Sequence, residues 1–455
     1  MRKGVVDTVY KTSPVWIQNI IVSVYGYLRF KERYGPVYRK KFNEYIRKDY
    51  SSLETEIAEQ NKSLRDFIQF VNQHSNYYRD LYKGIDLSKI KEVKDLKLLP
   101  VVTKEDLRSN LEKVYTLAEK DSNIGFTGGT TGKSMMVRFT REDTQIRMAY
   151  LDAWKFGLGI DPFKVKKATF SGRSVIHKRN PKKFWRHNYT YRQRLYSTFH
   201  ITQETIPVYI KNLNKYKPDV INGFVSAIYE LAEYINRNSV DLRFTPKAIF
   251  TTSETLTTLH RSVIEKAFRC KVYDQYASAE GAPFITECKK GNLHYNLDTG
   301  VVERNDNGEM IVTSFTTRGT PLIRYNIADK VFFKAGSCSC GNSHPLVERI
   351  EGRAVDFLYN SEGGKVSLSH LADVIKGNPN SVIKMQFIQK SKKEVTVLLV
   401  VDKTLYNKSD ESTILSEMRY RFGEEMKITM KVVDEIPREG SGKYQLIKNL
   451  VDPNS

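Results

Sequence analysis

Short apolar runs alternate with amphipathic helical stretches between residues 166 and 277. Runs of this length favour buried strands, whereas apolar residues spaced three and four apart favour helices that pack on them. The alternation predicts a parallel sheet covered by helices, and hence an α/β fold. The expected strands are residues 166–172, 218–224, 247–254 and 270–277, and the expected helices are residues 207–217, 225–238 and 257–268.

Other parts of the chain carry different patterns. Residues 40–120 have the spacing of helices with charged faces, and residues 293–334 alternate like hairpins, which predicts a β-rich subdomain. Beyond residue 353, two strand patterns, a helix pattern and a further strand pattern follow within about 100 residues. We therefore expect a large domain over residues 1–352 and a small α+β lid domain over residues 353–455.

The chain carries a formal charge of +21 at pH 7, which is typical either of a solvated basic surface or of a protein with anionic partners: a nucleotide, a nucleic acid, a membrane surface or an acidic polymer. We expect no nucleic acid among them. The first residues lack the apolar segment of a secretory signal, and no apolar run is long enough to span a bilayer. Four cysteines in so long a chain do not make a disulfide scaffold. These observations together predict a cytoplasmic protein.

An apolar helix is predicted near the N-terminus, over residues 14–30. It is too short, and too polar at Gln18 and Asn19, to cross a membrane. Two alternatives stay open: the helix packs on its own domain, or it lies peripherally on the inner membrane surface. In the second case the cations near the lipid headgroups are Lys11, Arg29, Lys31 and Arg33.

A stretch rich in glycine and threonine, FTGGTTGKS at residues 126–134, has the composition of a loop that holds phosphates with backbone N–H groups. The nucleotide-hydrolase loop G-x-x-x-x-G-K-[ST] requires a glycine at position 127, where this chain has threonine. The stretch therefore argues against a nucleotide hydrolase and for another phosphate chemistry. Its candidate phosphate-binding residues are Thr127, Gly128, Gly129, Thr130, Thr131, Gly132, Lys133 and Ser134.

Five further motifs follow in order: TTSE at residues 251–254, YASAE at 276–280, RYNIAD at 324–329, GR at 352–353 and GK at 442–443. With the glycine loop, this order resembles the acyl-adenylate-forming (AMP-binding) enzymes. The resemblance is to their phenylacetate–CoA ligase-like branch, and most of all to the CapK-like proteins associated with capsular polysaccharide biosynthesis. It covers nearly the whole chain, and it implies a large ATP- and acid-binding domain with a mobile C-terminal lid.

The resemblance assigns roles to individual residues. The glycine loop holds the departing pyrophosphate of ATP, and Lys443 on the lid stabilises the charge between the attacking carboxylate and the α-phosphate. The ring of Tyr276 lies against adenine, Glu280 helps to hold Mg²⁺, and Asp329 accepts hydrogen bonds from the ribose hydroxyls. The expected nucleotide-binding set also includes Ser253, Glu254 and Arg353.

The chain departs from the family pattern at three positions. Ala279 stands where many relatives carry a threonine, which removes one hydroxyl contact. Ala328 stands where a glycine commonly precedes the aspartate. Val355 stands where the family usually has a charged hinge residue. We therefore expect a hinge in this region but do not assign it to one residue.

Two turns bring together residues with the chemistry of a zinc site. Cys288 and His294 flank one turn, and Cys338 and Cys340 form a C-x-C pair in another. Three thiols and an imidazole make a tetrahedral ligand set that leaves no open position, which predicts a structural zinc and not a catalytic one. The alternative is a group of reduced thiols without metal. Cys270 lies in a predicted strand and is expected in the core.

The predicted activity is therefore that of an AMP-forming ligase. ATP and Mg²⁺ activate a carboxylic acid as an acyl-adenylate, and the acyl group then passes to the thiol of coenzyme A or to an amine or hydroxyl acceptor such as a sugar precursor. The resemblance to CapK-like proteins points to surface polysaccharide biosynthesis. The alternative from another class is a catalytically inactive, basic protein that binds polyanions on the same fold.

Overall fold

The computed structural model describes most of the chain, in several stretches separated by gaps. Of the expected site residues, the loop at 127–134, Arg353 and Lys443 lie outside the described stretches. The described residues are 9–126, 135–171, 175–176, 183–198, 200–201, 203–351, 357–361, 365–367, 381–436 and 447–451.

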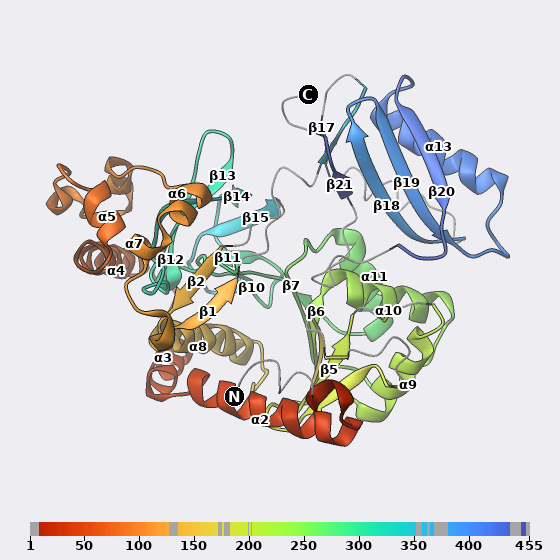
Figure 1. Cartoon of the computed structure of the whole chain (residues 1–455), viewed down its shortest axis with the longest axis horizontal. Helices are drawn as coiled ribbons and strands as arrows, with labels where there is room; N and C mark the ends of the chain where they lie inside the picture. Colours follow the sequence, from red (N-terminus) through yellow and green to blue (C-terminus); the bar gives the residue numbers. More distant parts are fainter. Residues whose placement is uncertain are drawn as a thin grey trace.

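The β/α alternation forms a six-stranded sheet in the order β4-β5-β3-β6-β7-β8, in which β5, β3, β6, β7 and β8 run parallel (Figure 1). Ile221, Ile249 and Phe250 are completely buried in its central strands, as expected for parallel strands covered on both faces. The predicted α/β fold is confirmed. The strands are β3 (Lys167–Ser171), β4 (Trp185–Asn188), β5 (Gln193–Ser197), β6 (Val220–Phe224), β7 (Ala248–Thr252) and β8 (Val272–Tyr273).

Helices cover both faces of this sheet. Helices α9, α10 and α11 pack on one face through residues such as Tyr209, Leu231 and Phe268, and Trp154 of α8 packs on the other face beside Phe250. The predicted helices of this region are confirmed to within two residues at each end. The helices that cover the sheet are α8 (Arg141–Gly157), α9 (Ile206–Tyr216), α10 (Val225–Arg237) and α11 (Thr258–Phe268).

A seven-stranded antiparallel sheet follows, in the order β12-β13-β14-β15-β11-β10-β9, and it confirms the predicted β-rich subdomain. The strand predicted over residues 270–277 is divided at Asp274: β8 ends the parallel sheet and β9 begins this one. The strands are β9 (Gln275–Tyr276), β10 (Ile285–Glu287), β11 (Leu293–Tyr295), β12 (Gly300–Arg304), β13 (Glu309–Ser314), β14 (Leu322–Lys334) and β15 (Leu346–Glu351).

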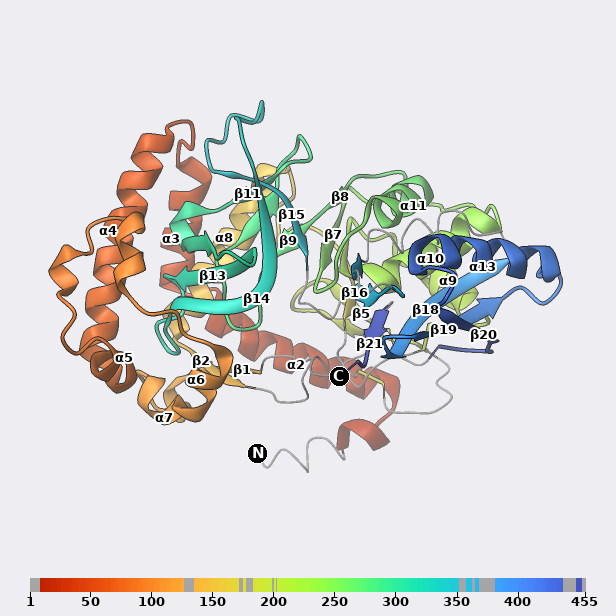
Figure 2. The same ribbon diagram turned by 90° about the horizontal axis from the view of Figure 1, so that it is seen from above.

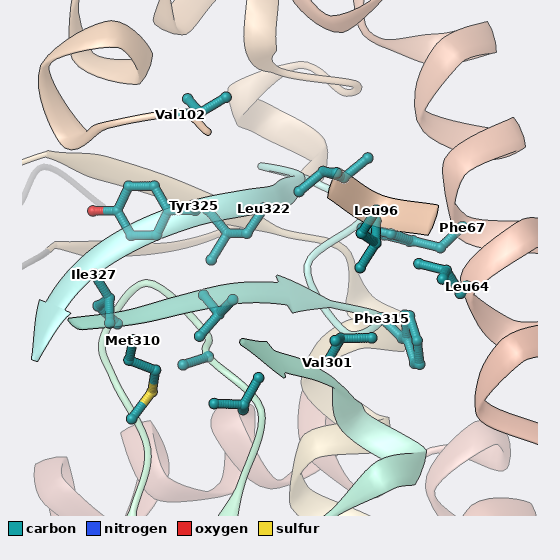
Figure 3. Packing of buried hydrophobic residues seen from close by; sticks show 14 of the residues in the cluster. Leu64, Phe67, Leu96, Val102, Val301, Met310, Phe315, Leu322, Tyr325 and Ile327 are labelled. Atoms are coloured by element: carbon teal, nitrogen blue, oxygen red, sulfur yellow. The ribbon is translucent and has the colours of Figure 1, made fainter. Parts of the chain in front are cut away.

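The segments from α4 onward in the first part of the chain pack on the β-rich sheet, and the largest core lies between them and the sheet. Leu64 and Phe67 of α4 lie near Phe315, which directly follows β13, and Val301 of β12, and Leu322 of β14 belongs to the same core (Figure 3). Helix α2 contacts both α8 and β4 and so joins the two halves of the large domain (Figures 1 and 2). The elements are α2 (Val15–Arg33), α3 (Pro36–Arg47), α4 (Leu53–His74), α5 (Asn76–Leu81), α6 (Lys104–Ser109), α7 (Leu111–Val114), β1 (Asn123–Phe126) and β2 (Met136–Phe139).

The C-terminal part has a sheet and a hydrophobic core of its own. Its four-stranded sheet has the order β20-β19-β18-β21, and Phe387, Val397 and Met418 are buried between this sheet and α13. Two ion pairs link it to α10: Arg237 to Asp402 at 3.3 Å and Lys384 to Glu230 at 3.1 Å. The elements are β16 (Phe357–Tyr359), β17 (Lys365–Ser367), β18 (Val382–Ser391), β19 (Glu394–Val401), α13 (Lys408–Phe422), β20 (Lys427–Val432) and β21 (Ile447–Asn449).

Gly223 provides a test of the packing at the centre of the parallel sheet. A Cβ at this position would lie 2.1 Å from the carbonyl oxygen of Phe170 on the neighbouring strand β3. Because that obstacle is backbone, Gly223→Ala should lower the free energy of unfolding by about 1–3 kcal/mol, the usual cost of an overpacked core. Denaturant unfolding measures the change.

The matched control is Gly157→Ala at the end of α8, where an added Cβ meets nothing within 4 Å. This change should leave stability unaltered or raise it by about 0.5 kcal/mol, because alanine restricts the unfolded chain. Equal stability of the two variants would contradict the close approach of β3 and β6.

Candidate functional site

Several of the expected residues follow the carboxyl ends of the parallel strands, where ligands bind in open α/β sheets. Ser253 and Glu254 come directly after β7, and Ser253 has a left-handed backbone (φ 68°). The Glu254 carboxylate accepts hydrogen bonds from the backbone N–H (2.7 Å) and the hydroxyl (2.9 Å) of Ser226 in the first turn of α10. Glu254 thus caps this helix in the structure, a contact that the sequence pattern did not reveal.

Tyr276 and Asp329 are far apart in the sequence but meet in the fold. The Tyr276 hydroxyl donates a hydrogen bond of 2.6 Å to the Asp329 carboxylate. Tyr276 lies on β9 and Asp329 on β14, and three other strands separate β9 from β14 in the order of the sheet. The sheet is therefore curled strongly enough to bring these two strands within hydrogen-bond distance.

A bulge in β14 gives Asp329 its position. Pairing with β13 passes from Lys330 opposite Glu309 directly to Asn326 opposite Ile311, so that the residues between Asn326 and Lys330 arch out of the regular ladder. Ala328 in this arch has a left-handed backbone (φ 62°), and its N–H donates to the Asn326 side-chain oxygen at 2.8 Å. This conformation suits glycine best, which is the residue that the family resemblance leads us to expect here.

Glu280 is buried, with 4% of its surface exposed, and the turn around it is fixed by polar contacts. The Arg147 guanidinium of α8 donates to the carbonyls of Gly281 (2.8 Å) and Ala282 (3.1 Å) and to the Thr316 hydroxyl (2.9 Å). Burial lowers the pKa of Arg147 to about 10, so the group stays charged at neutral pH. Sequence reasoning missed Arg147 because an isolated helical arginine carries no motif.

Asp274 is a second buried group that the motifs did not indicate. Its carboxylate accepts hydrogen bonds from the Thr251 hydroxyl (3.3 Å), at the end of β7, and from the Gln275 N–H (2.9 Å). Burial, and then the neighbouring Glu287 carboxylate, raise the pKa of Asp274 to about 6. The contact with Thr251 ties the edge of the parallel sheet to the strand that carries Tyr276.

The two strands that flank the glycine loop lie near the turn that carries Glu280. β1 pairs with β2 in an antiparallel hairpin, with Phe126 opposite Met136. A Cβ on Gly125 would lie 3.9 Å from the carbonyl oxygen of Ala279, next to Glu280 in the chain. The described end of the loop thus borders the turn that carries Glu280, whereas the loop itself, Arg353 and Lys443 lie outside the described residues.

Cys288, His294, Cys338 and Cys340 come together, with their ligand atoms all within 4.8 Å of one another. Cys288 Sγ lies 3.8 Å from Cys338 Sγ, and Cys340 Sγ lies 3.5 Å from His294 Nε2. A tetrahedral zinc with Zn–S of about 2.3 Å and Zn–N of about 2.0 Å would separate two sulfurs by about 3.8 Å and a sulfur from a nitrogen by about 3.5 Å. The residues therefore fit a zinc ion.

The His294 imidazole is held in the orientation and the protonation form that a metal ligand needs. His294 Nδ1 lies 3.1 Å from the carbonyl oxygen of His344, which fixes the proton on Nδ1 and leaves Nε2 to face Cys340. Burial lowers the pKa of His294 and favours the neutral ring, which is the form that binds metals.

In a neighbouring polar cluster of Glu56, Asp298 and His344, the side chain of Lys48 provides the positive charge. The Lys48 ammonium lies 2.9 Å from the Glu56 carboxylate and 2.5 Å from that of Asp298. Burial alone would raise the pKa of Glu56, but its hydrogen bonds with His344 and Lys48 lower it. The cluster is therefore an ion-paired contact that joins Lys48, directly after α3, to α4, to the turn before β12 and to the loop before β15.

Comparison with known proteins places these features in a family. The family model described as the CapK C-terminal domain matches residues 358–450, which fall within the expected lid domain. "Protein CapK" of Staphylococcus aureus is 36% identical over 97% of this chain and 98% of its own length. Phenylacetate-coenzyme A ligase of Thermus thermophilus is 20% identical over 86% of this chain and 96% of its own length.

Solved structures show the same fold. 2-Hydroxyisobutyryl-CoA ligase in its postadenylation state, in complex with an acyl-AMP, matches with a TM-score of 0.72 at 16% identity, over 89% of this chain and 91% of its own. The same ligase in its thioesterification state matches over the same shares with a TM-score of 0.58. Among the described residues, no helix has the length and apolarity needed to cross a membrane.

A relative at 36% identity that spans nearly the whole of both chains, together with the shared two-part fold, confirms the expected family. The chain belongs to the CapK-like family within the acyl-adenylate-forming (AMP-binding) enzyme superfamily.

Proposed function

We propose that the protein is an AMP-forming ligase that activates a carboxylic acid with ATP. In the reaction, a carboxylate oxygen attacks the α-phosphorus of ATP, the bond to the bridging oxygen breaks, and pyrophosphate leaves, so that an acyl-adenylate forms. The observation that carries the proposal is the hydrogen bond between Tyr276 and Asp329, with the buried Glu280 four residues after Tyr276 in the chain.

The chemistry of these side chains suits the adenylate. The Asp329 carboxylate has oxygens for both ribose hydroxyls, and its hydrogen bond from Tyr276 fixes its orientation. The Tyr276 ring offers a flat apolar surface for adenine. Glu280 supplies a hard oxygen ligand of the kind that Mg²⁺ prefers, in a turn held by Arg147. When bound, Mg²⁺ would neutralise charge on the phosphates.

Three further groups complete the proposed site from outside the described residues. The loop at residues 127–134 would wrap the leaving pyrophosphate with backbone N–H groups. Arg353 would reach the ribose or the phosphate. Lys443 would place an ammonium between the carboxylate and the α-phosphate, where negative charge develops.

We further propose that residues 353–455 act as a lid that turns between two half-reactions. Their separate hydrophobic core supports motion as a unit. The Arg237–Asp402 pair is partly exposed and of a kind that is worth little, whereas the Lys384–Glu230 pair is largely buried, so both of its charges must return to water when the lid turns. The higher TM-score to a postadenylation structure supports assigning the present arrangement to the first half-reaction.

The acyl acceptor is proposed to be a thiol, amine or hydroxyl. The names of the similar ligases point to the thiol of coenzyme A, whereas a role in surface polysaccharide biosynthesis stays a prediction from the resemblance. A catalytically inactive polyanion-binding protein is disfavoured by the buried Glu280 and by Asp329, because a protein that only binds polyanions needs neither a metal-binding carboxylate nor a ribose-binding one.

ATP–pyrophosphate exchange with a panel of carboxylic acids tests the proposal. An active acid should drive incorporation of labelled pyrophosphate into ATP, which reports acyl-adenylate formation whatever the acceptor is. Failure of every acid, with a protein that still binds ATP, would favour the inactive alternative.

We also propose that Cys288, His294, Cys338 and Cys340 hold one structural zinc per chain. The sulfur–sulfur and sulfur–nitrogen spacings support a tetrahedral site, and the full ligand set leaves no place for a substrate. The site joins the turn between β10 and β11 to the loop before β15.

Zinc content and thermal stability check this assignment. Elemental analysis should find about one zinc per chain, and Cys338→Ser should abolish it and lower Tm by about 5 °C or more, because metal binding contributes to folding. Cys270→Ser is the matched control, since Cys270 packs against the core of the parallel sheet and should keep the zinc. A well-folded protein that contains no zinc would contradict the proposal.

Lys443→Ala tests the lid and the catalytic lysine together. Acyl-adenylate formation should fall by about 100- to 1000-fold, the usual cost of removing one preorganised charged group, or about 3–4 kcal/mol. ATP affinity should hardly change, and transfer from a supplied acyl-AMP should survive, because the lysine would serve only the first half-reaction. Titration calorimetry and separate assays of the two steps measure the three quantities.

Lys448→Ala on β21 is the control for this variant, five residues away and half-buried, and it should adenylate at the parental rate. Parental adenylation by Lys443→Ala would overturn the role of the lysine. An equal loss in both half-reactions would overturn its restriction to one lid position.

A further inference from the structure

Helix α2 is attached to the rest of the protein by hydrogen bonds of its polar side chains. Arg186 donates to the Gln18 side-chain oxygen, the His187 N–H donates to the Asn19 side-chain oxygen (2.9 Å), and the Tyr189 N–H donates to the Ser23 hydroxyl (3.0 Å). A Cβ on Gly26 would lie 2.5 Å from the Asn188 side chain, so the helix approaches β4 closely here. Val22 and Phe30 of the same helix also pack on the protein, so polar and apolar side chains together attach α2 to it.

The opposite face of α2 exposes large apolar side chains. Trp16 is 64% exposed, Ile20 50%, Val24 55% and Leu28 56%, and Tyr27 is 49% exposed. Positions 16, 20, 24 and 27 are spaced four, four and three apart, so these side chains form one continuous stripe along the helix. A contiguous exposed apolar stripe of this kind marks an interaction surface.

The charges around the stripe favour an anionic partner. Between residues 9 and 33 the chain carries four cations, Lys11, Arg29, Lys31 and Arg33, and one acidic residue, Glu32. Lys31 lies 4.8 Å from the centre of the Tyr27 ring, and Arg29 lies 5.4 Å from that of Tyr25. Arg29 also pairs with Glu32 at 2.8 Å, which leaves a net positive charge on the segment.

The type of residue on the stripe favours a lipid surface over a second copy of the chain. Tryptophan and tyrosine prefer the boundary between headgroups and acyl chains, and cations beside an apolar face attract anionic lipids. A face of 19 residues is about 28 Å long and about 10 Å wide, which would bury on the order of 300 Å² per partner, against about 800 Å² in a stable protein interface.

We propose that the exposed face of α2 binds the surface of an anionic membrane. The helix lies in the plane of the membrane with Trp16, Ile20, Val24 and Leu28 inserted between headgroups, and the cations contact lipid phosphates. This position would hold the large domain at the membrane while the contacts with β4 keep α2 fixed to the protein. The proposal does not depend on the adenylation chemistry.

Vesicle flotation with the full chain tests the proposal. The protein should float with vesicles of phosphatidylcholine and phosphatidylglycerol at about 70:30, and much less with phosphatidylcholine alone. Binding should weaken as salt rises from about 0.1 M to 0.5 M, since the headgroup attraction is screened. The combined change Ile20→Gln and Val24→Gln should lower the partition coefficient at least about tenfold.

Ile57→Gln is the matched control, an isoleucine 42% exposed on α4 that should leave vesicle binding unchanged. Because Ile20 and Val24 are at least half exposed, the double variant should keep its Tm within about 2 °C of the parental protein. Brominated acyl chains should quench part of the tryptophan fluorescence, and Trp16→Phe should abolish that part while Trp154 and Trp185 remain.

Three results would overturn the proposal. The first is a parental protein that stays unbound on anionic vesicles, and the second is a double variant that binds them as well as the parental protein does. The third is a dimer in solution that the double variant abolishes in the absence of lipid, which would assign the stripe to a second copy.

Discussion

The hydrogen bond from Tyr276 to Asp329 is the contact on which the candidate site depends, because it can form only if the seven-stranded sheet curls back on itself. Tyr276 begins this sheet directly after the parallel sheet ends, and Asp274 beside it is bonded to Thr251 at the end of β7. The same short segment thus belongs to both sheets. A change in the curl of one sheet would separate the groups proposed for the base and the ribose.

The backbone conformation around Asp329 and Glu280 is fixed by local contacts. The arch in β14 turns Asp329 out of the regular ladder, the left-handed Ala328 lies within it, and Arg147 binds the carbonyls that follow Glu280. A site preorganised in this way spends little binding energy on ordering its own residues, which is the condition under which fixed charges stabilise a transition state most.

The sequence predicted the elements whose signals are local. The β/α alternation, the lid pattern and the cysteine pairs on two turns each depend on spacing within a few tens of residues, and the structure contains them all. The strands β4 and β5 were missed because their sequences, WRHN and QRLYS, lack an apolar run. The capping role of Glu254 was also hidden, since its partner Ser226 lies 28 residues away.

The orientation of α2 also depends on contacts between residues that are far apart in the sequence. Its composition left packing and membrane contact open, and the structure shows that packing uses Gln18, Asn19 and Ser23. The partners of these side chains come from residues 186–190, some 165 residues later, so no pattern within the helix could reveal which face is turned inward. Gln18 is buried, and Asn19 and Ser23 face the protein beside Val22.

The most direct test of the account is the affinity of Asp329→Asn for ATP, measured by titration calorimetry against Asp306→Asn, an exposed carboxylate in the turn after β12. Asparagine keeps the size of the side chain and removes the charge that the ribose hydroxyls would meet. Since a hydrogen bond to a charged group is worth about 1.5–3 kcal/mol, the affinity should fall by about tenfold or more. Asp306→Asn should bind like the parental protein. Unchanged affinity in Asp329→Asn would contradict the placement of the nucleotide.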